Sequence, residues 1–143
     1  MNYLPQQTAL LLLDPSDGEF AESAMQAYGF EVIRYDSLDS LARDLTDATA
    51  KKSSDLRDIP TLVVVAGRHQ SLVDQKTISQ LVEIAPEAPV VVIGSQASIP
   101  LTVDLMRQGA SDVIPLPAER ETLRERLRKT VELSEGQRQK MAR

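Results

Sequence analysis

The stretch Thr61-Leu-Val-Val-Val-Ala66-Gly-Arg-His69 decides the fold, because its run of β-branched and aliphatic residues ends abruptly at a small residue and a glycine. An apolar run without polar alternation is typical of a strand that is covered on both faces. The run follows Pro60 and lies between other apolar runs, so we expect it to be the central strand of a parallel sheet. Ligands bind beyond the carboxyl ends of such strands. At Ala66 this end offers no acid, nucleophile or metal ligand.

Four other apolar runs surround this stretch, and amphipathic segments separate them. The predicted strands are residues 8–13, 30–35, 61–66, 90–93 and 112–114, and the predicted helices are residues 20–28, 38–45, 72–85, 100–108 and a last one that begins near residue 118. Five strands that alternate with five helices predict an α/β fold, a doubly wound (βα)5 parallel sheet with right-handed crossovers. The strand order 2-1-3-4-5 would place the ends of strands one, three, four and five around one crevice.

The composition supports one globular domain and excludes several functions. The 143 residues are 42% hydrophobic and 26% charged, and only 3% are aromatic, so the core is aliphatic. A net charge of −5 argues against direct binding to nucleic acid or to an anionic membrane. The absence of cysteine excludes disulfides and thiolate metal sites. No apolar run approaches the roughly 20 residues of a membrane span, and residues 1–7 do not resemble a signal peptide, so we expect a cytoplasmic location.

Several local signals predict where helices begin and end. Ser16 or Asp17 is expected to cap the first helix, and Gly29 to follow its end. Ser37 or Asp39 is expected to cap the second helix, and Gly109 to close the fourth. In the fourth helix the side chains predicted to face inward are those of Leu101, Leu105 and Met106. The polar segment 46–58, with Lys51 and Lys52, reads as a frayed helix end and a surface loop, although a basic pair there could also contact phosphate.

The segment Gly109-Ala-Ser-Asp-Val-Ile-Pro-Leu-Pro117 resembles the Gly-Ala-x-Asp-Tyr-hydrophobic-x-Lys-Pro passage of response-regulator receiver domains. Further similarities are found in residues 10–14, 29–32, 60–66 and 89–95, so the resemblance covers residues 8–133. It implies the CheY-like, flavodoxin-like fold of two-component signalling. Such receivers take a phosphoryl group from a histidine kinase onto an aspartate, with Mg²⁺ bound by neighbouring acids and a lysine and a Ser or Thr assisting.

Most of the machinery that this resemblance implies is missing from the sequence. The phosphoacceptor position falls on Ala66, the switch hydroxyl on Gly94, and the lysine on Leu116. Of the paired acids after the first strand only Asp14 remains, and one carboxylate is a poor Mg²⁺ site. The resemblance therefore implies a pseudo-receiver without catalytic residues, metal or cofactor, in which Asp14 and Ser95 line a degenerate pocket.

The remaining candidate residues each allow two interpretations. Asp14 could be a remnant metal ligand, but a helix or turn cap is the simpler role. His69, the one histidine, could be a phosphohistidine or a general base, although an exposed loop residue is the simpler interpretation. Gly67 and Gly94-Ser95, with Arg68, could form a small anion-binding nest.

The last helix and its neighbours carry a dense mixture of charges. These charges either form an ordinary solvated face with i, i+4 pairs or contribute to a homodimer face built from helix 4, strand 5 and helix 5. The residues of that candidate face are Asp104, Arg107, Asp112, Arg120 and Arg124. We expect residues 1–133 to be the receiver-like domain and residues 134–143 to begin a linker to an output domain beyond Arg143.

The function expected from the sequence is that of a regulatory module, not of an enzyme. It would act in a transcriptional regulator, such as a sigma-54-dependent activator, through dimerisation or partner contact that does not depend on phosphorylation. Two alternatives stay open: a conventional phosphoreceiver with a displaced acceptor, and a flavodoxin-like binder of a small molecule at the crevice around Asp14, Ala66, Gly94 and Ser95.

Overall fold

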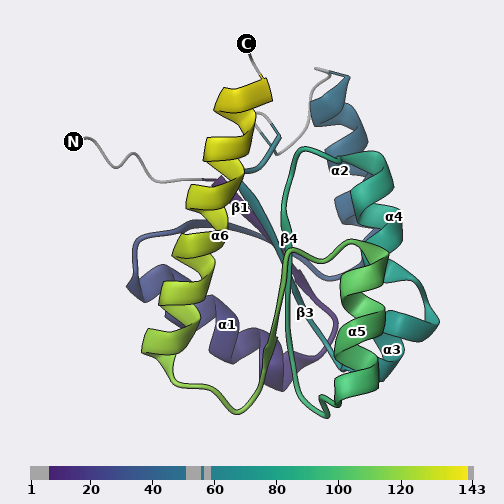
Figure 1. Cartoon of the computed structure of the whole chain (residues 1–143), viewed down its shortest axis with the longest axis vertical. Coiled ribbons are helices and arrows are strands. Elements are labelled where there is room, and N and C mark those ends of the chain that lie inside the picture. Colours follow the sequence, from purple (N-terminus) through teal and green to yellow (C-terminus); the bar gives the residue numbers. More distant parts are fainter. Residues whose placement is uncertain (1–6, 51–55, 57–58, 142–143) are drawn as a thin grey trace.

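A computed structural model describes residues 7–50, 56 and 59–141, with only the backbone course for 135–141. The strands are β1 (Gln7–Leu12), β2 (Glu31–Tyr35), β3 (Leu62–Ala66), β4 (Val90–Gly94) and β5 (Asp112–Pro115). The helices are α1 (Pro15–Ala27), α2 (Leu38–Thr49), α3 (His69–Asp74), α4 (Thr77–Ile84), α5 (Ile99–Gln108) and α6 (Arg120–Met141). All strand pairings are parallel and the order is β2-β1-β3-β4-β5, which confirms the predicted topology (Figure 1).

Alternate residues of the strands feed two separate apolar layers, because successive side chains of a strand point to opposite faces. One layer packs under α2, α3, α4 and α5, and includes Leu11, Val65 and Val92. The other packs under α1 and α6, and includes Leu12 and Ala66. Every residue of β3 and β4 is buried, as expected for central strands with helices on both faces.

Helix α1 begins earlier than the sequence pattern predicted. Asp14 is its N-cap, and its Oδ1 accepts hydrogen bonds from the backbone N–H groups of Ser16 (3.0 Å) and Asp17 (3.2 Å). Pro15 occupies the first turn, where a missing N–H is harmless. The expectation that Ser16 or Asp17 is the cap was therefore wrong, whereas the cap role of Asp14 is confirmed. Gly29 follows the helix with φ +85°, as predicted.

The predicted third helix, residues 72–85, is two helices. Lys76 takes a left-handed conformation (φ 54°) between α3 and α4, although it is not glycine. Helix α3 begins at His69, inside the segment that was expected to be a loop. Its N-cap residue, Arg68, makes no side-chain capping bond, and the helix is only six residues long.

The caps of the other helices mostly follow the sequence signals. Ser37 caps α2 through its Oγ, which accepts the Ser40 N–H, and Gly109 ends α5 with φ +116°. In α5 Leu105 is buried, but Met106 is 47% exposed, so the prediction that Met106 faces inward was wrong. Of the segment 46–58, residues 51–55 and 57–58, including Lys51 and Lys52, lie outside the described residues.

Helix α6 lies across the sheet face that it shares with α1 and extends past the end of the sheet (Figure 1). Its buried side chains are Leu123, Leu127 and Val131, whereas Leu133 is 61% exposed. The helix continues through Gly136 to Met141. In the described part of the chain, no helix is both long enough and apolar enough to cross a bilayer.

Candidate functional site

The predicted site lies at the carboxyl edge of the sheet, where the ends of four strands meet. Leu12 of β1 pairs with Ala66 of β3, which pairs with Ile93 of β4. Ala66 is fully buried, and its carbonyl oxygen accepts the N–H groups of Leu13 (2.8 Å) and Asp14 (3.2 Å). The chain therefore closes over the tip of β3 by backbone hydrogen bonds, at the position where the sequence predicted a missing acceptor.

Asp14 is committed to interactions inside the chain. One carboxylate oxygen caps α1, and the other lies 3.4 Å from Nε of Arg68, which follows β3. The capping bonds satisfy N–H groups that a helix start otherwise leaves free. Asp14 therefore holds the β1–α1 connection and neutralises Arg68.

A second carboxylate, which the sequence interpretation treated only as a possible cap, reaches into the site. Asp17 is 8% exposed, and its Oδ2 accepts hydrogen bonds from both the backbone N–H and the Oγ of Ser95, each at 3.1 Å. Ser95 follows β4, so this contact joins the first turn of α1 to the end of a distant strand. The one signal that could have revealed it is the three-residue spacing after Asp14, which places Asp17 in the first turn of a helix that begins at Pro15.

Backbone fills the place where the resemblance implied a switch hydroxyl. A Cβ atom built on Gly94 would lie 1.8 Å from the carbonyl oxygen of Gly67 and 2.9 Å from its carbonyl carbon. The Gly67 N–H donates to the Ile93 oxygen at 3.0 Å, and the Leu116 N–H donates to the Gly94 oxygen at 2.9 Å. Position 94 thus accepts no side chain unless one of these bonded backbone segments moves.

His69 lies beneath this edge and not in an exposed loop, so that interpretation was wrong. As the first residue of α3 it is fully buried, with Cδ2 3.0 Å from the Cβ position of Gly94. Neither Nδ1 nor Nε2 has a hydrogen-bond partner among the residues that the structure describes. Burial lowers the pKa of His69 below 6.5, and the nearby charge of Asp17 opposes this shift in part.

The site offers no set of ligands for an anion or a metal among the described residues. The N–H groups proposed to form a nest are already used, because Gly67 donates to Ile93 and Ser95 donates to Asp17. Arg68 faces Asp14. No group of three or more His, Asp or Glu side chains that could hold a metal ion occurs in the described ranges. Leu116, at the position of the lysine, is partly buried against the α1–α6 layer, and its bond to Pro117 is cis.

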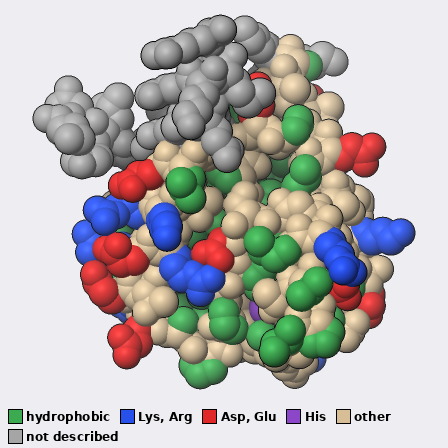
Figure 2. Space-filling view, in the orientation of Figure 1, with side chains coloured by type: hydrophobic (Ala, Val, Ile, Leu, Met, Phe, Trp, Pro, Cys, Tyr) green, Lys and Arg blue, Asp and Glu red, His purple; other side chains and the backbone are tan. Residues whose placement is uncertain are grey.

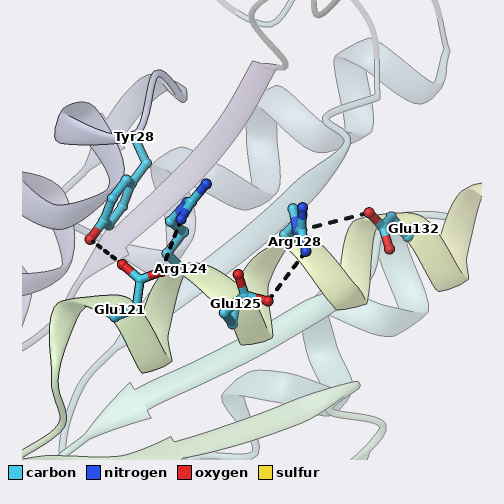
Figure 3. A network of polar contacts seen from close by, with 6 residues as sticks. All are labelled: Tyr28, Glu121, Arg124, Glu125, Arg128 and Glu132. Atoms are coloured by element: carbon cyan, nitrogen blue, oxygen red, sulfur yellow. Dashed lines mark hydrogen bonds and ion pairs between the residues drawn. The ribbon is translucent and has the colours of Figure 1, made fainter.

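Three residues of the predicted dimer face have partners within the chain. Asp112 receives two hydrogen bonds from the guanidinium of Arg126, one of them 2.9 Å long. Arg120 donates to Ser23 (3.1 Å). Arg124 pairs with Glu121 (2.9 Å) and its guanidinium carbon lies 5.0 Å from the ring centroid of Tyr28. Figure 3 shows these contacts of Arg124 continuing along α6 into the pairs of Arg128 with Glu125 and Glu132.

The exposed side of α5 is apolar, which the sequence interpretation missed. Ile99, Val103 and Met106 are 82%, 42% and 47% exposed, and their i, i+4, i+7 spacing places them on one face. We call these three residues the α5 stripe. Hydrophobic side chains gather over this helix in Figure 2. Asp104 and Arg107 lie on the same helix, and neither forms an ion pair within the described part of the chain.

Comparisons with known proteins agree with this architecture. No protein-family model matches the sequence. The C4-dicarboxylate transport transcriptional regulatory protein DctD of Pseudomonas aeruginosa is 29% identical over 127 residues, which cover 89% of this chain but 26% of that protein. The chain thus spans about a quarter of this relative.

Solved structures show the same fold. NtrX from Brucella abortus aligns with a TM-score of 0.78 at 19% identity, over 97% of this chain and 29% of NtrX. A CheY-like response-regulator receiver domain from Methanospirillum hungatei aligns with a TM-score of 0.71 at 11% identity, over 94% of this chain and 99% of that one. The chain therefore has the CheY-like receiver fold.

Proposed function

We propose that this receiver fold is a phosphorylation-independent regulatory module, which acts by association and not by chemistry. The observation that carries the proposal is the internally satisfied site. Asp14 is bound to a helix start and to Arg68, Asp17 is bound to Ser95, and the backbone of Gly67 occupies the space beside Gly94.

Aspartyl phosphorylation needs groups that are missing from these positions. A carboxylate must attack phosphorus, and a divalent cation must offset the charge of the phosphoryl oxygens. Ala66 offers no carboxylate, and Leu116 offers no cation for the product. Asp14 and Asp17 place carboxylates at this edge of the sheet, and each already accepts hydrogen bonds from the chain. These facts also disfavour the displaced-acceptor alternative, and the closed contact at Gly94 disfavours a small-molecule pocket at this edge.

We further propose homodimerisation through α5, β5 and α6, with the α5 stripe at its centre. Contiguous exposed apolar side chains on a small protein commonly mark interaction sites. Charged residues of α6 that have partners within the chain add little to association, since exposed ion pairs contribute about 0–1 kcal/mol. The apolar stripe is therefore expected to contribute more than Asp112, Arg120 or Arg124.

The wider setting is proposed by analogy with the relative that covers most of this chain. DctD is a transcriptional regulatory protein, and this chain matches about a quarter of it. We propose that the module belongs to a cytoplasmic transcriptional regulator of the sigma-54-dependent type and that an output domain follows Arg143. Fold alone does not specify such a role, so the assignment depends on that similarity.

Phosphorylation is tested by incubating the protein with Mg²⁺ and a small-molecule phosphoryl donor and measuring its intact mass. We expect no adduct, whereas a conventional receiver treated in parallel gains one. A stoichiometric, acid-labile adduct would refute the proposal, and peptide mapping would then show whether Asp14 or Asp17 is a displaced acceptor.

Association is tested by sedimentation equilibrium across a range of concentrations. The Val103→Asp variant places a charge in the middle of the α5 stripe and is expected to weaken dimerisation at least tenfold. Thr46→Asp adds the same charge to an exposed site on α2 and serves as the matched control. A protein that stays monomeric, or a dimer that Val103→Asp leaves unchanged, would contradict this interface.

A further inference from the structure

His69 is the one ionisable side chain, within the described residues, that is completely removed from solvent. In the described part of the chain neither ring nitrogen has a hydrogen-bond partner, although buried polar groups in folded proteins nearly always have one. The ring lies between the first turn of α3 and the end of β4, against Gly94. Nothing in the proposed function uses this imidazole, so its position needs a separate explanation.

Charged side chains occur on α3 itself and on two other elements, α1 and α5. They are Asp14 and Asp17 at the start of α1, Arg68 and Asp74 at the two ends of α3, and Asp104 and Arg107 on α5, which packs against α3. Asp17 is the one whose charge affects the pKa of His69, and it favours the protonated form. Burial has the larger, opposite effect, so the imidazole is neutral near pH 7.

Two hydrogen-bond acceptors at this edge, Asp17 Oδ2 and the Ala66 carbonyl oxygen, already hold two donors each. The Oδ2 of Asp17 accepts two bonds from Ser95, and the Ala66 carbonyl accepts bonds from Leu13 and Asp14. An imidazolium has two N–H donors and a charge that an apolar layer does not solvate. Since α3 has six residues and no side-chain cap, its first turn lacks the capping bond that holds the starts of α1, α2 and α5.

We propose that His69 is a proton-operated latch, in which the neutral ring holds the first turn of α3 against the end of β4 and protonation releases that turn. The movement would reach α5, which packs against α3 and carries the apolar stripe. The latch acts within one chain, so it can be tested separately from phosphorylation and from dimerisation.

The sign of the pH dependence follows from the lowered pKa. The released state has an ordinary imidazole and binds more protons than the closed state, so closure is favoured above pH 6.5 and lost as the pH falls below it. At pH 5.5, one unit below the ordinary value, the released state gains at most about tenfold in population relative to pH 7.5, the full gain applying when the closed ring takes up no protons.

Hydrogen exchange measured by mass spectrometry at pH 7.5 and 5.5, corrected for intrinsic exchange rates, tests the latch. Peptides that cover residues 67–75 of the untagged protein are expected to lose protection at the lower pH, by up to about tenfold. His69→Met keeps a buried side chain of similar volume and should abolish the pH response. Thr77→Val changes another fully buried polar residue that does not titrate, and should retain it.

A direct titration complements the exchange experiment. The chain contains a single histidine, so its imidazole proton resonances can be followed by NMR without assignment. The titration midpoint is expected below 6.5. A midpoint at or above 6.5, or a tenfold pH response that persists in His69→Met, would overturn the proposal. If His69→Met does not fold, the midpoint in the unmodified protein decides.

Discussion

Two glycines at the carboxyl edge of the sheet provide a matched test of how far this site has closed. A Cβ at Gly67 would lie 3.3 Å from Cβ of Leu13, a few tenths of an ångström too close at most, and 3.4 Å from Cδ2 of Leu72, the end of a flexible side chain. A Cβ at Gly94 would lie 1.8 Å from a backbone oxygen, whereas ordinary contacts begin near 3.4 Å. Gly67→Ala and Gly94→Ala add the same methyl group, so their difference reports the closeness of the backbone.

The expected magnitudes follow from these contacts. Gly67→Ala stabilises the folded protein by about 0.4–1 kcal/mol, because alanine restricts the unfolded chain, and crowding in the folded state costs a similar amount. The net change in the free energy of unfolding should therefore be within about 1 kcal/mol. Gly94→Ala forces overpacking worth about 1–3 kcal/mol. It also strains the hydrogen bonds of Gly67 to Ile93 and of Leu116 to Gly94, each worth about 1 kcal/mol. We expect Gly94→Ala to reduce the free energy of unfolding by about 2–4 kcal/mol.

Urea unfolding followed by far-ultraviolet circular dichroism measures both variants, since the chain contains no tryptophan. The slope of the free energy of unfolding against urea concentration must be the same in both variants, because a different slope would indicate an altered unfolded or folded state. If Gly94→Ala proves as stable as Gly67→Ala, the space beside Gly94 is open and our account of the site is wrong. The same result would make a serine or threonine at position 94 sterically acceptable.

The remaining predictions concern Ala66 and the contact between Asp17 and Ser95. Ala66→Asp should not restore labelling by a phosphoryl donor and Mg²⁺, because Gly94 and Leu116 still lack the helping groups; efficient Mg²⁺-dependent labelling would show a less degraded site. Asp17→Ala should reduce the free energy of unfolding by about 1–3 kcal/mol, because it leaves the partly buried N–H of Ser95 without this acceptor. Ser95→Ala removes only a hydroxyl and should cost about 1 kcal/mol or less; equal losses in the two variants would argue against the backbone contact.

The sheet could be predicted from the sequence because buried parallel strands need uninterrupted apolar runs. Residues 62–66 and 90–94 are apolar up to their last positions and fully buried. The helix boundaries were harder to predict. The break at Lys76 involves neither glycine nor proline, so no local signal separates α3 from α4. The early start of α1 was missed because Asp14-Pro15 reads equally well as a turn that ends the strand.

Which groups the site lacks remains a prediction from the resemblance, whereas the contacts that the structure shows at this edge could not be predicted from the sequence. The positions of Ala66 and Leu116 follow from the chain order and the resemblance. The bond between Asp17 and Ser95 joins residues that are 78 positions apart, and the burial of His69 depends on how α3 packs against β4. The burial of Met106 was predicted wrongly because α5 carries apolar residues on both its buried and its exposed sides. The spacing of apolar residues therefore does not show which face of the helix points to the core.

The continuous course of α6 has a consequence for how anything joined to its end is oriented. An α-helix turns about 100° and rises about 1.5 Å per residue, so a rigid helix fixes the angular phase of whatever follows it. Val131 is packed against the sheet layer, and the helix continues from there to Met141. A reporter fused in helical register behind this segment would rotate by about 100° for each residue inserted after Val131. A signal that rises and falls with this rotation would show that the output depends on the angular orientation of the fused part. A signal that does not vary with the rotation would show that the output depends only on how close the fused part is held.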